Sequence, residues 1–254
     1  MDDSSILPFY DLQAFLSSSD NSYLNTINVI GNPFSYPYKA ELMDLLYSIP
    51  VKKNFYLTAS TACRFIKEIQ QIDLPNYELY IYYEQEEASI HHILTEKQIP
   101  FHWIYLISSE KQYEDLEKLE TKYGNEYVEV HPIYTGDNLP FFEENVYLAE
   151  EDILQSNYDK QDIFAHQVMN TNFWGRLSVL PDGKVYSNLN HPPLGTLKDR
   201  VYDLIVDEMT SKRAWRWIRD EVSPCKDCLF RYLCPSPSNY ELVIGKPNLC
   251  HVKP

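Results

Sequence analysis

The chain has 254 residues and a formal net charge of −15, and 44% of its residues are hydrophobic. This length and apolar content suffice for one large domain, or for a medium domain with a small appendix. No run rich in lysine and arginine occurs, which disfavours nucleic acid and anionic membranes as partners. No apolar run is long enough to span a membrane, and the N-terminal segment does not look like a secretory signal.

Between residues 26 and 132, strand-like and helix-like segments alternate. Apolar, β-branched or aromatic runs predict five strands, at 26–30, 54–59, 78–83, 102–107 and 127–132. The amphipathic segments between them predict four helices, at 39–49, 61–72, 86–98 and 110–124. Ser108 or Ser109 suits the start of the last helix and Gly124 suits its end. Strands that recur roughly every 24 residues with helices between them imply parallel pairing and right-handed crossovers.

Five strands are fewer than the eight of a complete TIM barrel, which needs roughly 250 residues by itself. The predicted fold class is therefore α/β, with an incomplete parallel βα barrel over residues 1–165. A transition that contains a short acidic helix covers residues 133–170. Residues 166–254 are expected to form a second, small α+β domain.

This second domain is expected to begin with a β-hairpin. Strands are predicted at 176–180 and 184–188, around the turn formed by Pro181, Asp182 and Gly183. Two helices are then predicted, at 197–209 and 211–222, before a cysteine-rich tail.

Four of the five cysteines lie in that tail, as Cys225, Cys228, Cys234 and Cys250. Their spacing, C-x2-C-x5-C-x15-C, predicts one metal centre with four thiolates, of the kind that holds zinc or an iron–sulfur cluster. Zinc ligands usually come as two close C-x2-C pairs, and only one such pair occurs here, which favours the cluster modestly. Disulfides are the alternative, but four cysteines in one short tail are more typical of a cytosolic metal site.

Other polar and aromatic residues give weaker signals. His91 and His92 are adjacent on a predicted helix and point about 100° apart, so they are poorly placed to chelate one metal. Cys63 is expected to be a buried small residue, and His251 an exposed one. Trp174, Trp215 and Trp217 are expected to form a core between the hairpin and the helices. Because no P-loop, G-x-S-x-G or HExxH motif occurs, no catalytic residue is predicted.

From about residue 166 onward the chain resembles a SPASM domain, the auxiliary-cluster domain of radical S-adenosylmethionine enzymes that mature ribosomal peptides. The resemblance rests on the PDG-x-VY hairpin, on Leu194-Gly195 before a helix, and on the C-x2-C-x5-C run. It implies one [4Fe-4S] cluster on the four tail cysteines, with one zinc ion as the alternative. The positions that correspond to the family's first auxiliary cluster hold Asn172, Asn188 (or Ser187) and Ser238, so that cluster is expected to be absent.

The upstream repeat resembles a degenerate radical SAM partial barrel. Gly31, Asn32 and Pro33 look like a remnant of the glycine-rich segment that contacts the cofactor in that family. The defining CxxxCxxC loop is missing, because no three cysteines occur close together before residue 225. Neither cleavage nor binding of S-adenosylmethionine is therefore expected.

The whole pattern resembles pseudo-radical-SAM/SPASM proteins of peptide-modification systems in Bacteroidota. One such group accompanies a true radical SAM maturase that acts on peptides with a Gly-Gly leader, and the other, grasp-with-SPASM, is paired with an ATP-grasp ligase. The resemblance implies a cytoplasmic accessory protein that binds the precursor peptide, the modifying enzyme or both. A redox partner or enzyme that passes electrons through the cluster, and a zinc-stabilised binding scaffold, are the alternatives.

Overall fold

The computed structural model describes residues 6–18, 22–72, 74–83, 88–124 and 128–252. Its contacts divide the chain into two compact units. One unit is Tyr23–Thr135, and the other combines Met1–Ser22 with Gly136–Pro254. The division expected near residue 165 lies inside the second of these units, within helix α8 (Lys160–Val168).

The unit Tyr23–Thr135 is built on a five-stranded parallel sheet, which makes the chain an α/β protein. Its strands follow one another in chain order, and every neighbouring pair is parallel. The expectation of five parallel strands is confirmed, although the predicted start of the last strand, residue 127, lies outside the described residues. The strands are β1 (Thr26–Ile30), β2 (Lys52–Thr58), β3 (Tyr77–Tyr82), β4 (Phe101–Ile107) and β5 (Val128–Pro132).

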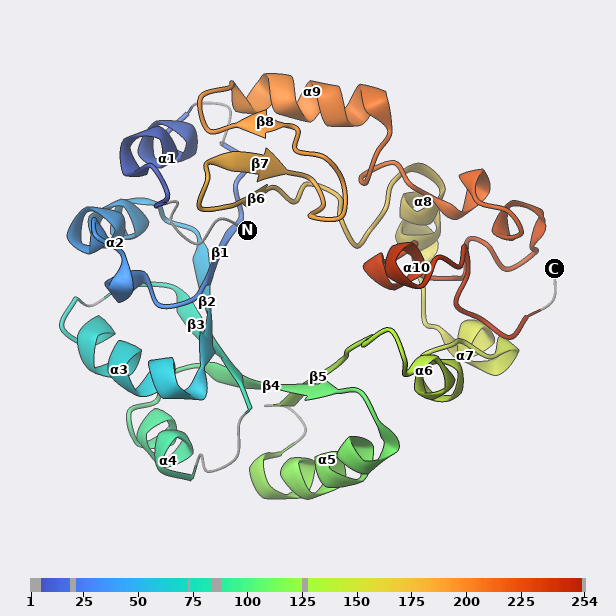
Figure 1. Ribbon diagram of the computed structural model, residues 1–254, viewed down its shortest axis with the longest axis horizontal. Coiled ribbons are helices and arrows are strands. Elements are labelled where there is room, and N and C mark those ends of the chain that lie inside the picture. Colours follow the sequence, from blue (N-terminus) through green and yellow to red (C-terminus); the bar gives the residue numbers. More distant parts are fainter. Residues whose placement is uncertain (1–5, 19–21, 73, 84–87, 125–127, 253–254) are drawn as a thin grey trace. The chain divides into compact units, whose positions relative to one another are not determined.

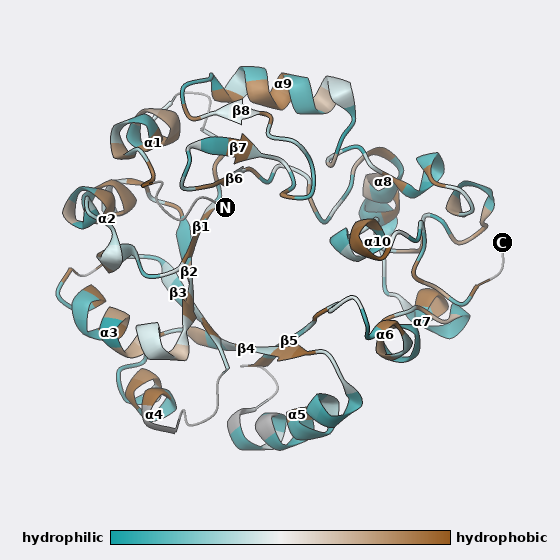
Figure 2. Cartoon of the chain, viewed as in Figure 1, coloured by the Kyte–Doolittle hydropathy of each residue, from teal (hydrophilic) through white to brown (hydrophobic). Residues whose placement is uncertain are grey.

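The four predicted helices of this unit are also present, although residues 86 and 87 of the third lie outside the described residues. The four helices lie together on one face of the sheet (Figure 1). They are α2 (Lys39–Ser48), α3 (Ala59–Ile69), α4 (Ala88–Glu96) and α5 (Glu110–Tyr123). A short 3-10 helix, η2 (Pro33–Ser35), follows β1. Figure 2 colours most of α5 as hydrophilic, in keeping with its many charged residues. The side chain of Ser109 does not cap α5, although Gly124 ends it with φ +87°.

The two faces of the sheet differ in chemistry. Side chains that point toward the helices, such as Phe55, Leu79 and Ile81, are fully buried. On the opposite face, the rings of Tyr56 and Tyr80 stack at 4.8 Å and those of Tyr80 and His102 at 4.9 Å. Because strand side chains alternate between faces, the row of rings follows from the register of β2, β3 and β4.

The other unit combines short helices with a small antiparallel sheet. The predicted hairpin is confirmed, since β6 (Ser178–Val179) pairs antiparallel with β7 (Lys184–Tyr186). A third strand, β8 (Gly195–Thr196), also pairs with β7 and was not expected. The helices are α1 (Phe9–Leu16), α6 (Leu139–Asn145), α7 (Glu150–Gln155), α8, α9 (Val201–Ser211) and α10 (Asn239–Ile244), with 3-10 turns η4 (Arg219–Glu221) and η5 (Cys225–Asp227).

The helix predicted at 211–222 is wrong. Helix α9 ends at Ser211, Lys212 takes a left-handed conformation, and only the turn η4 follows. The buried carboxylate of Glu208 accepts hydrogen bonds from the backbone N–H groups of Ala214 and Trp215, at 2.7 and 2.8 Å. These amides are therefore satisfied by a side chain, which removes them from any helical ladder.

Within the described residues, no helix is both long enough and apolar enough to cross a membrane.

Candidate metal centre

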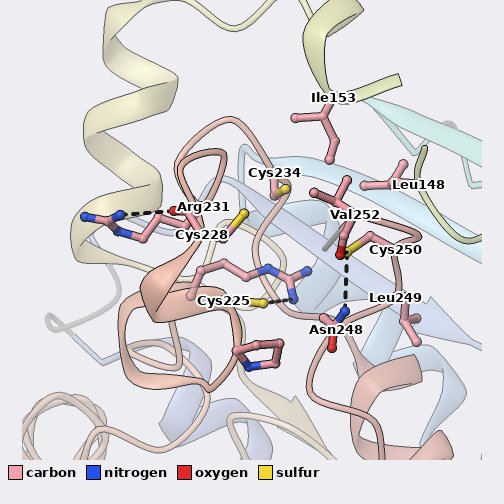
Figure 3. A pocket seen from close by; sticks show the side chains of 12 residues that line it. Leu148, Ile153, Cys225, Cys228, Arg231, Cys234, Asn248, Leu249, Cys250 and Val252 are labelled. Carbon is pink, nitrogen blue, oxygen red and sulfur yellow. Dashed lines mark hydrogen bonds between the residues drawn. The ribbon is translucent and has the colours of Figure 1, made fainter. Parts of the chain in front are cut away.

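The four tail cysteines line one cavity. Its volume is about 20 Å³, enough for a body the size of a water molecule or an ion. Figure 3 shows Cys225, Cys228, Cys234 and Cys250 around this space, which also borders the apolar side chains of Leu148, Ile153, Leu249 and Val252. All five cysteines of the chain are free thiols, so the disulfide alternative finds no support.

Local turns place the first three cysteines. The turn η5 brings the N–H of Cys228 to the carbonyl of Cys225 at 2.9 Å, so both side chains leave one tight turn. A second turn brings the N–H of Cys234 to the carbonyl of Phe230 at 3.0 Å. Because these three cysteines are close in sequence, short turns are sufficient to place them.

Cys250 is placed by pairing with a distant segment. It forms an isolated parallel bridge with Leu148, in the link between α6 and α7. The N–H of Leu148 donates to the carbonyl of Leu249 at 3.1 Å, and the N–H of His251 donates to the carbonyl of Leu148 at 3.0 Å. The fourth thiol is thus held by backbone hydrogen bonds rather than by a local turn.

Two nitrogen donors reach cysteine sulfurs at the cavity. Nη1 of Arg219 lies 3.8 Å from Sγ of Cys225, and Nδ2 of Asn248 lies 3.3 Å from Sγ of Cys250. Arg219 is buried and forms an ion pair with the equally buried Glu241, with 2.7 Å between Nη2 and Oε1. Sequence reasoning missed Arg219, Glu241 and Asn248, because nothing in their local sequence indicates that they meet the cysteines.

Burial favours the protonated form of two of the thiols, those of Cys225 and Cys234, in the metal-free protein. It raises the pKa of Cys234 to about 11, although the Arg219 guanidinium acts in the opposite direction. Burial also raises the pKa of Cys225, again against the effect of Arg219. Because a metal binds the thiolate, metal binding here must release protons.

The donor set fits a thiophilic metal or cluster. The residues that line the cavity include four thiols and no carboxylate, the donor chemistry of zinc or of an iron–sulfur cluster rather than of Mg²⁺ or Ca²⁺. In the described part of the chain, no three histidine, cysteine, aspartate or glutamate side chains are placed to hold an ion as they stand. The thiols would therefore have to move toward one another when a metal enters.

Asn172, Asn188 and Ser238, the positions at which the sequence led us to expect no cluster, belong to a network of amides and hydroxyls. Nδ2 of Asn172 donates to the carbonyl of Ser236 at 2.9 Å, and Nδ2 of Asn188 donates to Oδ1 of Asn239 at 2.7 Å. Ser238 caps α10, its hydroxyl accepting from the N–H of Tyr240 at 3.2 Å. The three positions thus meet at one short segment, which they tie together by hydrogen bonds.

The other residues singled out in the sequence are not among those that line this cavity. His91 packs edge-on against Phe101 and His92 lies 3.6 Å from Glu96, so the two histidines do not converge. Cys63 is half-buried on α3 rather than fully buried.

The tryptophans and His251 differ in how far they are exposed. Trp215 is buried with Phe173 and packs against Trp217, as expected for a core. The expectation is wrong for Trp174, which is 40% exposed although its ring contacts that of Trp215 at 5.7 Å. His251 is exposed, as expected, and its Nε2 lies 2.7 Å from the carbonyl oxygen of Glu143, outside the cavity lining.

Comparison with known proteins identifies no relative: no family model, no curated protein and no solved structure matches the chain. The function must therefore be argued from the cavity and the sheet themselves.

Proposed function

We propose that this protein is an accessory factor in the maturation of a ribosomally made peptide, one that binds the precursor peptide, the modifying enzyme or both. The observation that carries the proposal is the convergence of Cys225, Cys228, Cys234 and Cys250 on one cavity. These thiolates would hold one auxiliary-type [4Fe-4S] cluster. When bound, such a cluster transfers single electrons or simply holds the tail in its fold.

The parallel sheet supports a degenerate barrel as the other half of the protein. Its strand order has no reversal, and its helices lie on a single face, whereas a doubly wound sheet has both a reversal and helices on two faces. The edge strands β1 and β5 each pair with one neighbour in the described sheet, and an extended peptide could add a further strand there. The modifying enzyme would be a radical SAM maturase or an ATP-grasp ligase. We propose that this chain does not itself cleave S-adenosylmethionine.

A redox role is the second candidate, and one observation favours it. Leu229, the residue after Cys228, is 91% exposed, so the cysteine cavity lies close to the surface of its unit. A cluster there would accept an electron from a reductant and pass it to a docked partner. A zinc-stabilised binding scaffold is the third candidate, since the same thiols suit zinc.

The first test is the iron, sulfide and zinc content of anaerobically purified protein, with its visible spectrum. About four irons and four sulfides per chain would support the cluster. One zinc without iron would favour the zinc-stabilised binding scaffold. Protein without either metal would refute the assignment of the cysteines as metal ligands.

The binding role needs its own test. A fluorophore-labelled precursor peptide with a Gly-Gly leader is titrated with the protein, and anisotropy is recorded with a scrambled peptide as the control. We expect saturable binding of the native peptide alone. If neither this peptide nor a purified radical SAM or ATP-grasp partner binds, the accessory role is wrong even where the metal is present.

A further inference from the structure

Arg219 is fixed in place by contacts that leave one of its nitrogens directed at a sulfur. Its side chain is 8% exposed. Nη2 pairs with Glu241 at 2.7 Å, Nε donates to the carbonyl of Pro235 at 3.1 Å, and Nη1 donates to the carbonyl of Pro247 at 3.3 Å. The same Nη1 reaches Sγ of Cys225 at 3.8 Å. The guanidinium therefore cannot leave the sulfur without breaking several hydrogen bonds.

Asn248 provides a second, independent donor on another part of the cavity wall. Its Nδ2 lies 3.3 Å from Sγ of Cys250, as the dashed line in Figure 3 marks. Asn248 is two residues from this cysteine, whereas Arg219 is six residues from Cys225. Two different elements thus direct N–H groups at two different thiols of the same cavity.

A buried ion pair is an expensive way to fill a protein core. Well-packed apolar side chains of similar volume are often as stable or more so, which makes the pair of Arg219 and Glu241 poor evidence of a purely stabilising role. The pair has a function when a metal occupies the cavity, because four thiolates around a dication carry a net negative charge that the guanidinium can offset. A fixed cation and a fixed amide dipole beside that charge would lower its energy.

We propose that Arg219 and Asn248 are positioning residues of the metal centre, which donate N–H···S hydrogen bonds to the thiolates of Cys225 and Cys250. They stabilise the thiolate form, strengthen metal binding and raise the reduction potential of an iron–sulfur cluster, since hydrogen bonds to the sulfurs offset the extra negative charge of the reduced state. This inference rests on the proposed metal site and adds two residues to it that are not ligands.

The decisive variant is Asn248→Ala, because it removes one donor and leaves the buried ion pair intact. The matched control is Asn190→Ala, whose side chain bonds Asn239 instead of a sulfur. For the second donor, Arg219→Lys keeps a positive charge but lacks the planar fork. Its control is Arg213→Lys, because Arg213 pairs with Asp207 at 3.2 Å and does not line the cavity.

Each variant is purified anaerobically and measured in two ways. Metal affinity is obtained by chelator competition, and the midpoint potential of any cluster by a redox titration followed by electron paramagnetic resonance. We expect Asn248→Ala and Arg219→Lys each to weaken metal affinity about 10- to 100-fold and to lower the midpoint potential. The two controls should match the unmodified protein.

The outcomes separate this inference from the proposed function. If the unmodified protein binds metal but Asn248→Ala and Arg219→Lys leave affinity and potential unchanged, the metal site stands and the hydrogen bonds to sulfur do not matter. If the unmodified protein binds no metal at all, both the site and this inference are overturned. A loss of folding in Arg219→Lys is recognised by circular dichroism, and Asn248→Ala then decides the question alone.

Discussion

Glu208 and Trp215 are joined by a buried hydrogen bond, in which the carboxylate accepts from the backbone N–H at 2.8 Å. The same carboxylate accepts from the N–H of Ala214 and from the hydroxyl of Ser187, so one side chain connects the hairpin, α9 and the turn that follows. This turn leads directly to Arg219 and the cysteines. The geometry of the candidate metal centre therefore depends in part on a carboxylate that does not line its cavity.

Replacement of Glu208 by alanine is expected to destabilise the protein strongly. The change leaves two buried amides and one hydroxyl without their acceptor, and each such loss costs about 1–3 kcal/mol. We expect a loss of roughly 3–5 kcal/mol in the free energy of unfolding, measured by urea denaturation. The neighbouring change Asp207→Ala removes only a surface ion pair with Arg213 and should cost less than about 1 kcal/mol. Equal effects of the two substitutions would contradict the role given to Glu208.

Lys53 is fully buried, and its Nζ has no hydrogen-bond partner among the described residues. An unpaired buried amine is costly, whereas a methionine of similar length fills the same space without charge. Lys53→Met is therefore expected to raise the free energy of unfolding by about 1–3 kcal/mol. The control is Lys52→Met, because Lys52 is the adjacent residue and pairs with Glu78 at 2.7 Å near the surface. That substitution should be neutral or slightly destabilising.

The pH dependence of stability provides a second test of Lys53. Burial lowers the pKa of Lys53 below its usual 10.5. The unfolded chain therefore binds more protons than the folded one between the two pKa values, and the contribution of Lys53 to stability rises with pH across that window. Lys53→Met should abolish this rise, which is measured as the difference between the unfolding curves of the two proteins from neutral pH to pH 10. Parallel pH profiles would show that Lys53 finds a partner in solution.

The four tail cysteines should be required for metal content, and Cys63 should not. Cys225→Ala removes a thiol of the cavity, so bound metal and thermal midpoint are both expected to fall because the metal stabilises the tail. Cys63→Ala is the matched control, since this half-buried thiol lies on α3 in the other unit. Metal content is measured by mass spectrometry and the midpoint by calorimetry. Full occupancy in Cys225→Ala would remove that residue from the ligand set.

Metal uptake should increase with pH. With a pKa of about 11, only about one Cys234 thiol in a thousand is a thiolate at pH 8 in the metal-free protein. Protons compete with the metal below that pKa, so the apparent affinity is expected to rise steadily as the pH is raised from 6 to 9. The affinity is measured by chelator competition at several pH values. In the metal-free protein, we also expect iodoacetamide to alkylate Cys234 slowly. A flat affinity over this range would mean that the thiols are already ionised.

The unit that contains the parallel sheet was predictable from the sequence, because its strands and helices are long enough for the spacing of apolar residues to reveal them. The run at 26–30 is a strand with the predicted bounds, and the strand predicted at 102–107 begins one residue earlier, at Phe101. The helix expected at 211–222 failed because its amides bond Glu208, and neither apolar spacing nor helix propensity reveals such a contact. Helices α6 and α8 were missed, since their few turns carry too little pattern.

The candidate metal centre was likewise predictable only in part. The spacing of the cysteines predicted one metal centre with four thiolates, and the four thiols line one cavity, three of them placed by local turns. The sulfur contacts of Arg219 and Asn248 were not predictable, since they depend on the carbonyls of Pro235 and Pro247 and on the position of Glu241. Whether the cavity holds iron or zinc stays a prediction.

The bridge between Leu148 and Cys250 gives the centre an influence beyond the tail. A metal that holds the thiol of Cys250 also restrains the backbone of Leu148, and with it the link between α6 and α7. The amides of Leu148 and His251 would then exchange their hydrogens with solvent slowly in the loaded protein and quickly after the metal is removed. Two amides far apart in sequence would thus report on the occupancy of a single site.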